Sequence, residues 1–203
     1  MPPIRKQDRS VTLEKAMRCF LKLGFNGASI ADLEGATGTN RRQIFRDFES
    51  KQSLFIECLQ TFAAIASERL LQPLQHPEAG LEQIRSTLYS IAAQPDSPEA
   101  CFGCLVCNTS IDYSAMRDPA IFTIVNEFLF KIEAAYANAL LGAIRKGEIP
   151  SDALEDSDLG KVMLAAHVGM LVLVKSGKSR EAMEQIAAEN VCMLLGKIGF
   201  RSP

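Results

Sequence analysis

Residues 29–48, SIADLEGATGTNRRQIFRDF, decide how the chain is expected to fold. Ser29 can cap a first short helix over residues 30–36, and Asn40 can cap a second over residues 41–47, because their side-chain oxygens accept from the free backbone N–H groups at a helix start. Gly38 lies between the two helices, where a residue without a Cβ tolerates positive φ. The segment therefore predicts two short helices joined by a tight turn.

The second of these helices has an apolar face and a cationic face. Its apolar residues Ile44, Phe45 and Phe48 recur at helical spacing. The face left outward is formed by Arg41, Arg42, Gln43 and Arg46. A short cationic helix braced by a partner helix can lie in a DNA major groove and present Arg and Gln to phosphates and base edges. A solvated helical hairpin would show the same local pattern, so the flanking sequence has to decide between the two.

The flanking sequence favours DNA binding, because the wider pattern resembles the TetR family of bacterial one-component transcriptional repressors. The resemblance covers roughly residues 5–60 and rests on Ala16, Phe20, Gly24-Phe25, residues 29–33, Ala36-Thr37-Gly38, Ile44-Phe45, Phe48, Ser50-Lys51 and Leu54-Phe55. It implies DNA contacts by Arg41, Arg42, Gln43, Phe45 and Arg46, with Ser29, Thr39, Asn40 and Lys51 positioning the DNA backbone. Phe45 departs from the family pattern, which usually has a tyrosine there whose hydroxyl reaches a phosphate.

Helical periodicity continues through the rest of the chain, and no strand-like alternation occurs in the sequence. The predicted fold is all-α, with a three-helix helix-turn-helix domain over residues 1–50 and a ligand-sensing and dimerisation domain over residues 51–203. The expected helices after the first domain cover residues 51–71, 81–93, 100–116, 121–145, 157–175 and 180–198. Asp118-Pro119 is typical of a cap followed by proline at the first helical position.

The sequence also favours a homodimer. Ala165 and Gly169 lie four residues apart, which would let another helix approach closely. The family resemblance implies that the last two helices pair with their copies as a four-helix bundle. Two recognition helices would then read the half-sites of a palindromic operator, about 34–36 Å apart. A monomer in which these helices only complete the core is the alternative.

Charge and hydropathy favour a cytoplasmic location and a polyanionic partner. Up to Lys51 there are ten Lys and Arg against six Asp and Glu, and the rest has twelve against eighteen. A basic N-terminal part suits a polyanionic partner. The start of the sequence lacks the apolar region of a secretion signal, and the most apolar run, residues 162–174, is shorter than the ~20 residues that span a bilayer. Double-stranded DNA, and not a membrane, is the expected partner.

Three clustered cysteines, Cys101, Cys104 and Cys107, mark a second informative stretch. The segment Gly103-Cys104-Leu105-Val106 resembles a TetR subgroup that includes the N-ethylmaleimide repressor, a sensor of electrophiles, which implies that Cys104 is a sensing thiol. A thiolate near a helix start has a lowered pKa, as such a sensor needs. Simple packing of three small residues and binding of a soft metal such as Cu(I) remain open. No cofactor and no dedicated metal site are predicted.

A small apolar molecule held between body helices is the alternative effector. Aromatic and aliphatic side chains could line such a cavity, namely Phe62, Leu88, Phe102, Phe122, Val125, Phe128 and Tyr136. They could equally form plain core. Either effector would act by a population shift, in which the helix that begins at Lys51 moves and spreads the two recognition helices.

The predicted function is therefore DNA-binding transcriptional regulation, by a repressor released from its operator by a ligand or by thiol modification. The rival is a thiol-dependent, peroxidase-like enzyme that uses Cys104. The sequence places no histidine close to Cys104 and contains no clear resolving arrangement, both of which speak against catalysis. Steady peroxide consumption would indicate the enzyme, whereas a single stoichiometric oxidation would indicate a sensor.

Overall fold

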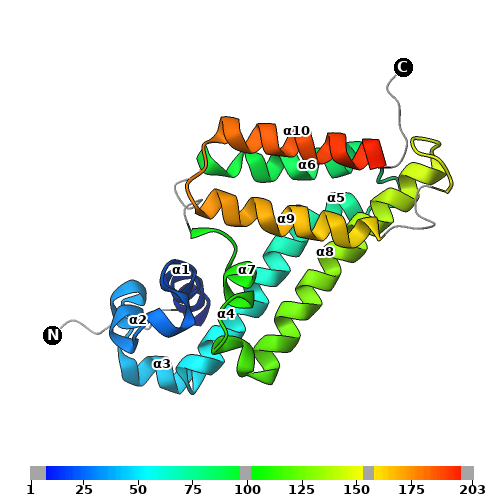
Figure 1. Ribbon diagram of the computed structural model, residues 1–203. Coiled ribbons are helices and arrows are strands. Elements are labelled where there is room, and N and C mark those ends of the chain that lie inside the picture. Colours follow the sequence, from blue (N-terminus) through cyan, green and yellow to red (C-terminus); the bar gives the residue numbers. More distant parts are fainter. Residues whose placement is uncertain (1–7, 97–101, 153–157, 198–203) are drawn as a thin grey trace. The chain divides into compact units, whose positions relative to one another are not determined.

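The computed structural model describes residues 8–96, 102–152 and 158–197, which are helices and connecting turns without a β-strand (Figure 1). The all-α prediction is therefore confirmed for the described residues. In chain order the elements are α1 (Arg9–Gly27), α2 (Ile30–Thr37), α3 (Arg41–Phe48), α4 (Lys51–Ala66), the π-helical turn η1 (Ser67–Leu71), α5 (Gln72–Gln75), α6 (Leu81–Ala92), the 3₁₀ turn η2 (Gln94–Asp96), α7 (Leu105–Ser110), the 3₁₀ turn η4 (Ala115–Arg117), α8 (Pro119–Arg145), α9 (Leu159–Lys175) and α10 (Arg180–Lys197).

These helices form two compact units. The first consists of the described residues of Met1–Ala64 and Cys104–Asn126, and the second of those of Ile65–Gly103 and Glu127–Pro203. The chain thus enters the first unit twice, since α7 and the first turns of α8 join α1, α2, α3 and most of α4. None of the described helices is long and apolar enough to cross a membrane.

The core of the first unit is aromatic and aliphatic. Phe20 and Phe55 meet edge to face with their ring centroids 4.9 Å apart, and both side chains are fully buried. Leu33 from α2 and Ile44 from α3 are also fully buried. On α1 the buried stripe consists of Thr12, Ala16, Cys19 and Phe20. Val11 and Leu23 of the same helix are exposed.

In the second unit α6 packs against α9 and α10, which also contact each other (Figure 1). Its core includes Leu88, Ile132, Tyr136 and Met183, all fully buried. Gly142 allows α8 to touch the turn before α6, because a Cβ at this position would lie 1.9 Å from the carbonyl oxygen of Ala79. Any larger residue at position 142 would therefore push the turn away from α8.

The helix predicted over residues 51–71 differs in its second half. Regular α-helix ends at Ala66, and η1 follows, closed by a hydrogen bond from the Gln72 N–H to the Ser67 carbonyl. Pro73 lies in the first turn of α5 and has no N–H to donate to an α-helical carbonyl. This missing donor explains why the α-helical hydrogen-bond pattern does not continue unchanged through residue 73.

The helix predicted over residues 100–116 is wrong in extent. Only residues 105–110 form α7, and Cys104 is its cap residue, with extended backbone angles. Gly103 has φ +69° immediately before it, which ends any helix there. After α7, the carboxylate of Asp112 accepts from the N–H groups of Ser114 and Ala115, both at 3.1 Å, and so stabilises a turn. Asp118 caps α8 ahead of Pro119, as predicted, by accepting from the N–H groups of Ala120 and Ile121.

Candidate nucleic-acid interface

Two reciprocal caps fix the start of α2. The N–H of Asp32 donates to the Ser29 hydroxyl at 3.1 Å, and the N–H of Ser29 donates to the Asp32 carboxylate at 2.9 Å. The hydroxyl and N–H of Ser29 hold the pKa of Asp32 below its usual value. Gly38 follows α2 in the left-handed region at φ 70°, and its N–H donates to the Glu34 carbonyl. The predicted cap and turn are both confirmed.

Helix α3, the candidate recognition helix, has one face in the core and one in solvent. Asn40 caps it, with the Gln43 N–H 2.9 Å from the Asn40 side-chain oxygen. The apolar residues Ile44 and Phe48 are buried. The cationic residues Arg41, Arg42 and Arg46 are exposed, as their spacing predicts. The first unit therefore presents three guanidinium groups on one short, well-braced helix.

The three arginines differ in the intramolecular contacts that their guanidinium groups make. Arg41 stacks over Phe45, with its guanidinium carbon 5.2 Å from the ring centroid. The Arg46 Nε donates to Asp47 at 3.0 Å. Arg42 makes no hydrogen bond or ion pair with the part of the chain that the structure describes. Arg42 is thus the arginine with the most freedom to meet a phosphate or a base edge.

Gln43 differs from the expectation that it faces outward. Its side chain is half-buried, and its amide nitrogen is buried with no hydrogen-bond partner among the described residues. A buried amide nitrogen without an acceptor costs about 1–3 kcal/mol. Rotation of Gln43 toward a base would remove that cost.

Glu34 is a residue of this surface that the sequence pattern did not reveal. Its carboxylate oxygen lies 2.6 Å from the backbone nitrogen of Arg41, so it accepts the first N–H of α3. Glu34 therefore stabilises the turn through two hydrogen bonds. Its backbone carbonyl accepts from the Gly38 N–H, and its carboxylate accepts from the Arg41 N–H at the start of α3. The only signal in the sequence was the unusual Glu34-Gly35 pair inside α2.

The flanking residues predicted to position DNA are already engaged within the first unit. Thr39 is only 3% exposed, and its hydroxyl lies 3.3 Å from that of Thr12. The Lys51 ammonium donates to the Ala28 carbonyl at 2.8 Å and lies 4.7 Å from the Phe25 ring centroid. These contacts give Thr39 and Lys51 a structural role in this unit, whatever they contact beyond it.

Arg9 also stabilises the domain. Its guanidinium binds both oxygens of Glu57, at 2.7 and 2.8 Å, and its Nε donates to the Asp47 carbonyl at 3.2 Å. It also lies over the Phe48 ring at 4.5 Å. The first turn of α1 is therefore tied to α3 and α4. The basic residues Arg5 and Lys6, which precede Arg9 in the sequence, lie outside the described residues.

The structure places two of the three clustered thiols together at the start of α7. Cys104 is 8% exposed and Cys107 is 4% exposed. The pKa of Cys104 is lowered, chiefly because the Cys107 thiol can donate to its thiolate and also because backbone N–H groups of Cys107 and Val106 face it. The pKa of Cys107 is raised by the same pairing and by burial. Cys101 lies outside the described residues.

The aromatic and aliphatic residues predicted to line an effector cavity are spread over both units. Leu88, Val125, Phe128 and Tyr136 are buried, whereas Phe62 and Phe102 are half-buried. The expectation that Phe122 faces inward is wrong, since it is 52% exposed. The described part of the chain contains no group of three or more potential metal ligands from His, Cys, Asp and Glu.

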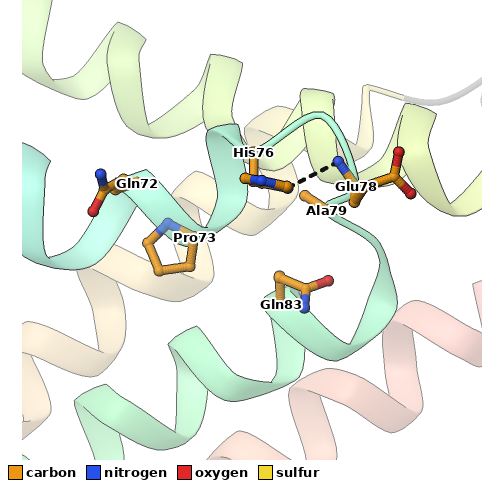
Figure 2. Close-up of a pocket in the computed structure, with 6 residues that line it drawn as sticks. All are labelled: Gln72, Pro73, His76, Glu78, Ala79 and Gln83. Carbon is orange, nitrogen blue, oxygen red and sulfur yellow. Dashed lines mark hydrogen bonds between the residues drawn. The ribbon is translucent and has the colours of Figure 1, made fainter.

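A surface cavity of about 400 Å³ lies in the second unit (Figure 2). At its edge the Glu78 N–H donates to the His76 Nδ1 at 3.1 Å. Its lining residues are Gln72, Pro73, His76, Glu78, Ala79 and Gln83. None of the residues predicted to bind an effector is among them.

Comparison with known proteins finds relatives of the helix-turn-helix segment. Residues 13–58 match the family model for bacterial regulatory proteins of the tetR family. The chain is 26% identical over 195 residues to the HTH-type transcriptional repressor ComR of Escherichia coli (strain K12), which covers 89% of this chain and 85% of that protein. The matched residues include α2, the turn at Gly38 and α3.

The whole fold is similar to that of several solved proteins. One is the TetR family transcriptional regulator CifR, solved as a cysteine mutant with 26bp double-strand operator DNA, with a TM-score of 0.78, 22% identity and coverage of 93% of this chain and 97% of that chain. Another is the reduced form of E. coli NemR, with a TM-score of 0.74, 20% identity and coverage of 90% and 94%. Both the N-terminal helix-turn-helix and the helical body are thus shared.

Proposed function

We propose that this chain is a transcriptional regulator of the TetR family that represses transcription as a homodimer bound to a palindromic operator until an effector releases it. The observation that carries the proposal is the division of α3 into a buried face with Ile44 and Phe48 and an exposed face with three arginines. The repressor ComR and the operator complex of CifR support it as similar proteins. In this proposal residues 1–50 bind DNA, and residues 51–203 sense the effector and dimerise.

Arg42→Ala provides the direct test of the DNA-binding surface. Arg42 is exposed and otherwise uncommitted in the described chain, so its removal should leave the fold intact. Operator affinity should fall about 5- to 150-fold, the range for losing one arginine contact with a base or phosphate. Fluorescence anisotropy with the operator selected from random duplexes measures it. The control variant Arg85→Ala on α6 removes the same charge far from α3 in sequence and should bind the operator as wild type does. If Arg42→Ala bound the operator as tightly as wild type, the assignment of Arg42 to the DNA-binding surface would be refuted.

The dimer proposal rests on an uncovered apolar face of α9. Val162 and Val172 are each 48% exposed, and Ala165 and Gly169 between them are exposed as well. Their spacing of three, four and three residues places all four on one stripe. A Cβ built at Gly169 would meet nothing within 4 Å, so a second helix has room to approach there. A second copy of this chain would cover the stripe and set the spacing of the two α3 helices.

For the effector, we propose an electrophile or oxidant that modifies the Cys104 thiol, with a small apolar ligand as the alternative. The lowered pKa of Cys104 favours a thiolate, which is the reactive form. The Gly103-Cys104-Leu105-Val106 segment supports placement near the N-ethylmaleimide repressor subgroup. Treating the pure protein with N-ethylmaleimide should abolish operator binding, and Cys104→Ser should resist it. Release of the Cys104→Ser variant by the same treatment would exclude this thiol.

A further inference from the structure

The thiol-bearing segment belongs to the same compact unit as the DNA-binding helices. The described residues of Cys104–Asn126 cluster with α1, α2, α3 and most of α4, and α7 packs against α1. A change at Cys104 therefore arises inside the unit that carries α3. It does not need to travel through the second unit to reach the DNA-binding surface.

One contact joins the end of α1 to the turn after α7. The side-chain amide nitrogen of Asn26 lies 2.9 and 2.8 Å from the two carboxylate oxygens of Asp112, and 2.5 Å from the Ser114 hydroxyl. The same Asp112 carboxylate accepts from the Ser114 hydroxyl and the Ala115 N–H. Moving α7 would strain this group of bonds, since Asp112 follows the end of α7 by only two residues.

A second contact joins the start of α4 to the start of α8. The Gln52 amide donates to one carboxylate oxygen of Asp118, while the other oxygen caps α8 by accepting from Ala120 and Ile121 at 2.8 and 3.0 Å. Gln52 stands in the first turn of α4, four residues after the end of α3. The segment after α7 is thus fastened to the helices on both sides of the helix-turn-helix.

The thiols leave no room for an added group. Cys104 and Cys107 are buried, and a packed interior does not accept extra atoms without moving its surroundings. When the Cys104 thiolate adds to the double bond of N-ethylmaleimide, one sulfur–carbon bond forms and the neighbouring carbon takes a proton from water. Nothing leaves, so the whole maleimide stays on the sulfur. α7 must then shift from its present position.

We propose that Asp112, Ser114 and Asp118, with their partners Asn26 and Gln52, form a clasp that passes a change at Cys104 directly to α1 and α4. Asn26 and Asp112 are its positioning residues, because they act on α3 through the helices that hold it. The inference rests on the proposed function and names the regulation of that same site. The conformational change that starts at Cys104 then reaches the DNA-binding helices through α7, and not by movement of α4 alone.

Exchanging the two partners tests the clasp in the full-length protein without DNA. In Asn26→Asp two carboxylates face each other and the contact opens; adding Asp112→Asn restores a donor opposite an acceptor. Site-resolved mass spectrometry follows alkylation of Cys104 by N-ethylmaleimide. The Asn26→Asp variant should react about threefold to tenfold faster than wild type, as expected for losing a hydrogen-bonded contact, and the exchanged pair should return to the wild-type rate. Gln52→Ala, a milder change, should act in the same direction as Asn26→Asp.

Operator binding provides the second readout. Alkylated wild type and exchanged pair should lose the operator, whereas alkylated Asn26→Asp should keep more of its unmodified affinity, because its α7 no longer pulls on α1. Equal alkylation rates in all variants, or no recovery in the exchanged pair, would overturn the clasp. If no variant bound any duplex, the proposed function would fall instead, while the alkylation rates would still decide the clasp.

Discussion

The phenol oxygen of Tyr136 on α8 lies 3.0 Å from the Nδ1 of His167 on α9, and both side chains are completely enclosed by the second unit. Burial lowers the pKa of His167 to about 4 and raises the pKa of Tyr136. The pair is therefore neutral at physiological pH. It forms a polar hydrogen bond between two long helices whose other inward contacts are mainly apolar.

This pair predicts acid sensitivity. His167 titrates near 4 in the folded chain and near 6.5 when unfolded, so between these values the unfolded state binds more protons. The free energy of unfolding should thus fall as the pH drops, by about 2 kcal/mol between pH 7 and 5. Urea unfolding at both pH values measures it. His167→Gln should lose this part of the dependence, whereas the exposed His76→Gln should keep it; identical slopes in both variants would contradict the prediction.

Glu34 should affect operator binding in two opposite ways. Glu34→Gln keeps an acceptor for the Arg41 N–H but removes a negative charge next to the arginines, so operator affinity should rise a few-fold at low salt. Glu34→Ala removes the acceptor as well, leaves the start of α3 unfastened, and should bind more weakly than Glu34→Gln. Anisotropy at two salt concentrations separates the effects, with Glu82→Gln on α6 as the charge-matched control. A gain in Glu34→Ala as large as in Glu34→Gln would show that only the charge matters.

Val172→Glu should separate the subunits. It places a carboxylate in the middle of the α9 stripe, where a second copy would have to bury it without a partner. Sedimentation should show a monomer at concentrations where wild type is a dimer, and operator affinity should fall about 100-fold or more because two linked half-site contacts become one. Ala134→Glu, an exposed position on α8, makes the same kind of change and should stay dimeric. If the Val172→Glu protein were still a dimer, the dimer interface would have to lie on another face of the chain.

Local chemistry made the helix-turn-helix predictable. Ser29, Gly38 and Asn40 act on residues within four positions of themselves, so their roles can be seen in a short stretch of sequence. The contacts that hold α7 to α1 could not be predicted in this way, because Asn26 and Asp112 are 86 residues apart and neither belongs to an apolar pattern. The length of α7 was missed because nothing in the sequence showed that Gly103 adopts a positive φ.

Helical spacing predicts only part of the candidate site. The exposure of Arg41, Arg42 and Arg46 follows from helical spacing alone, and the structure agrees. The burial of the Gln43 amide nitrogen and the Glu34 contact depend on how α2 and α3 cross, which spacing within one helix does not determine.

The return of the chain to its N-terminal unit at Cys104–Asn126 sets a boundary for protein engineering. A chimaera that transplants only Met1–Ala64 onto another regulator would leave behind α7 and the carboxylates of Asp112 and Asp118, which accept from Asn26 and Gln52. In the chimaera the side chains of Asn26 and Gln52 would lack their carboxylate acceptors, and the DNA-binding helices would lose their link to the thiols. A working exchange of specificity has to carry both pieces of the chain, or rebuild those two carboxylates on the recipient.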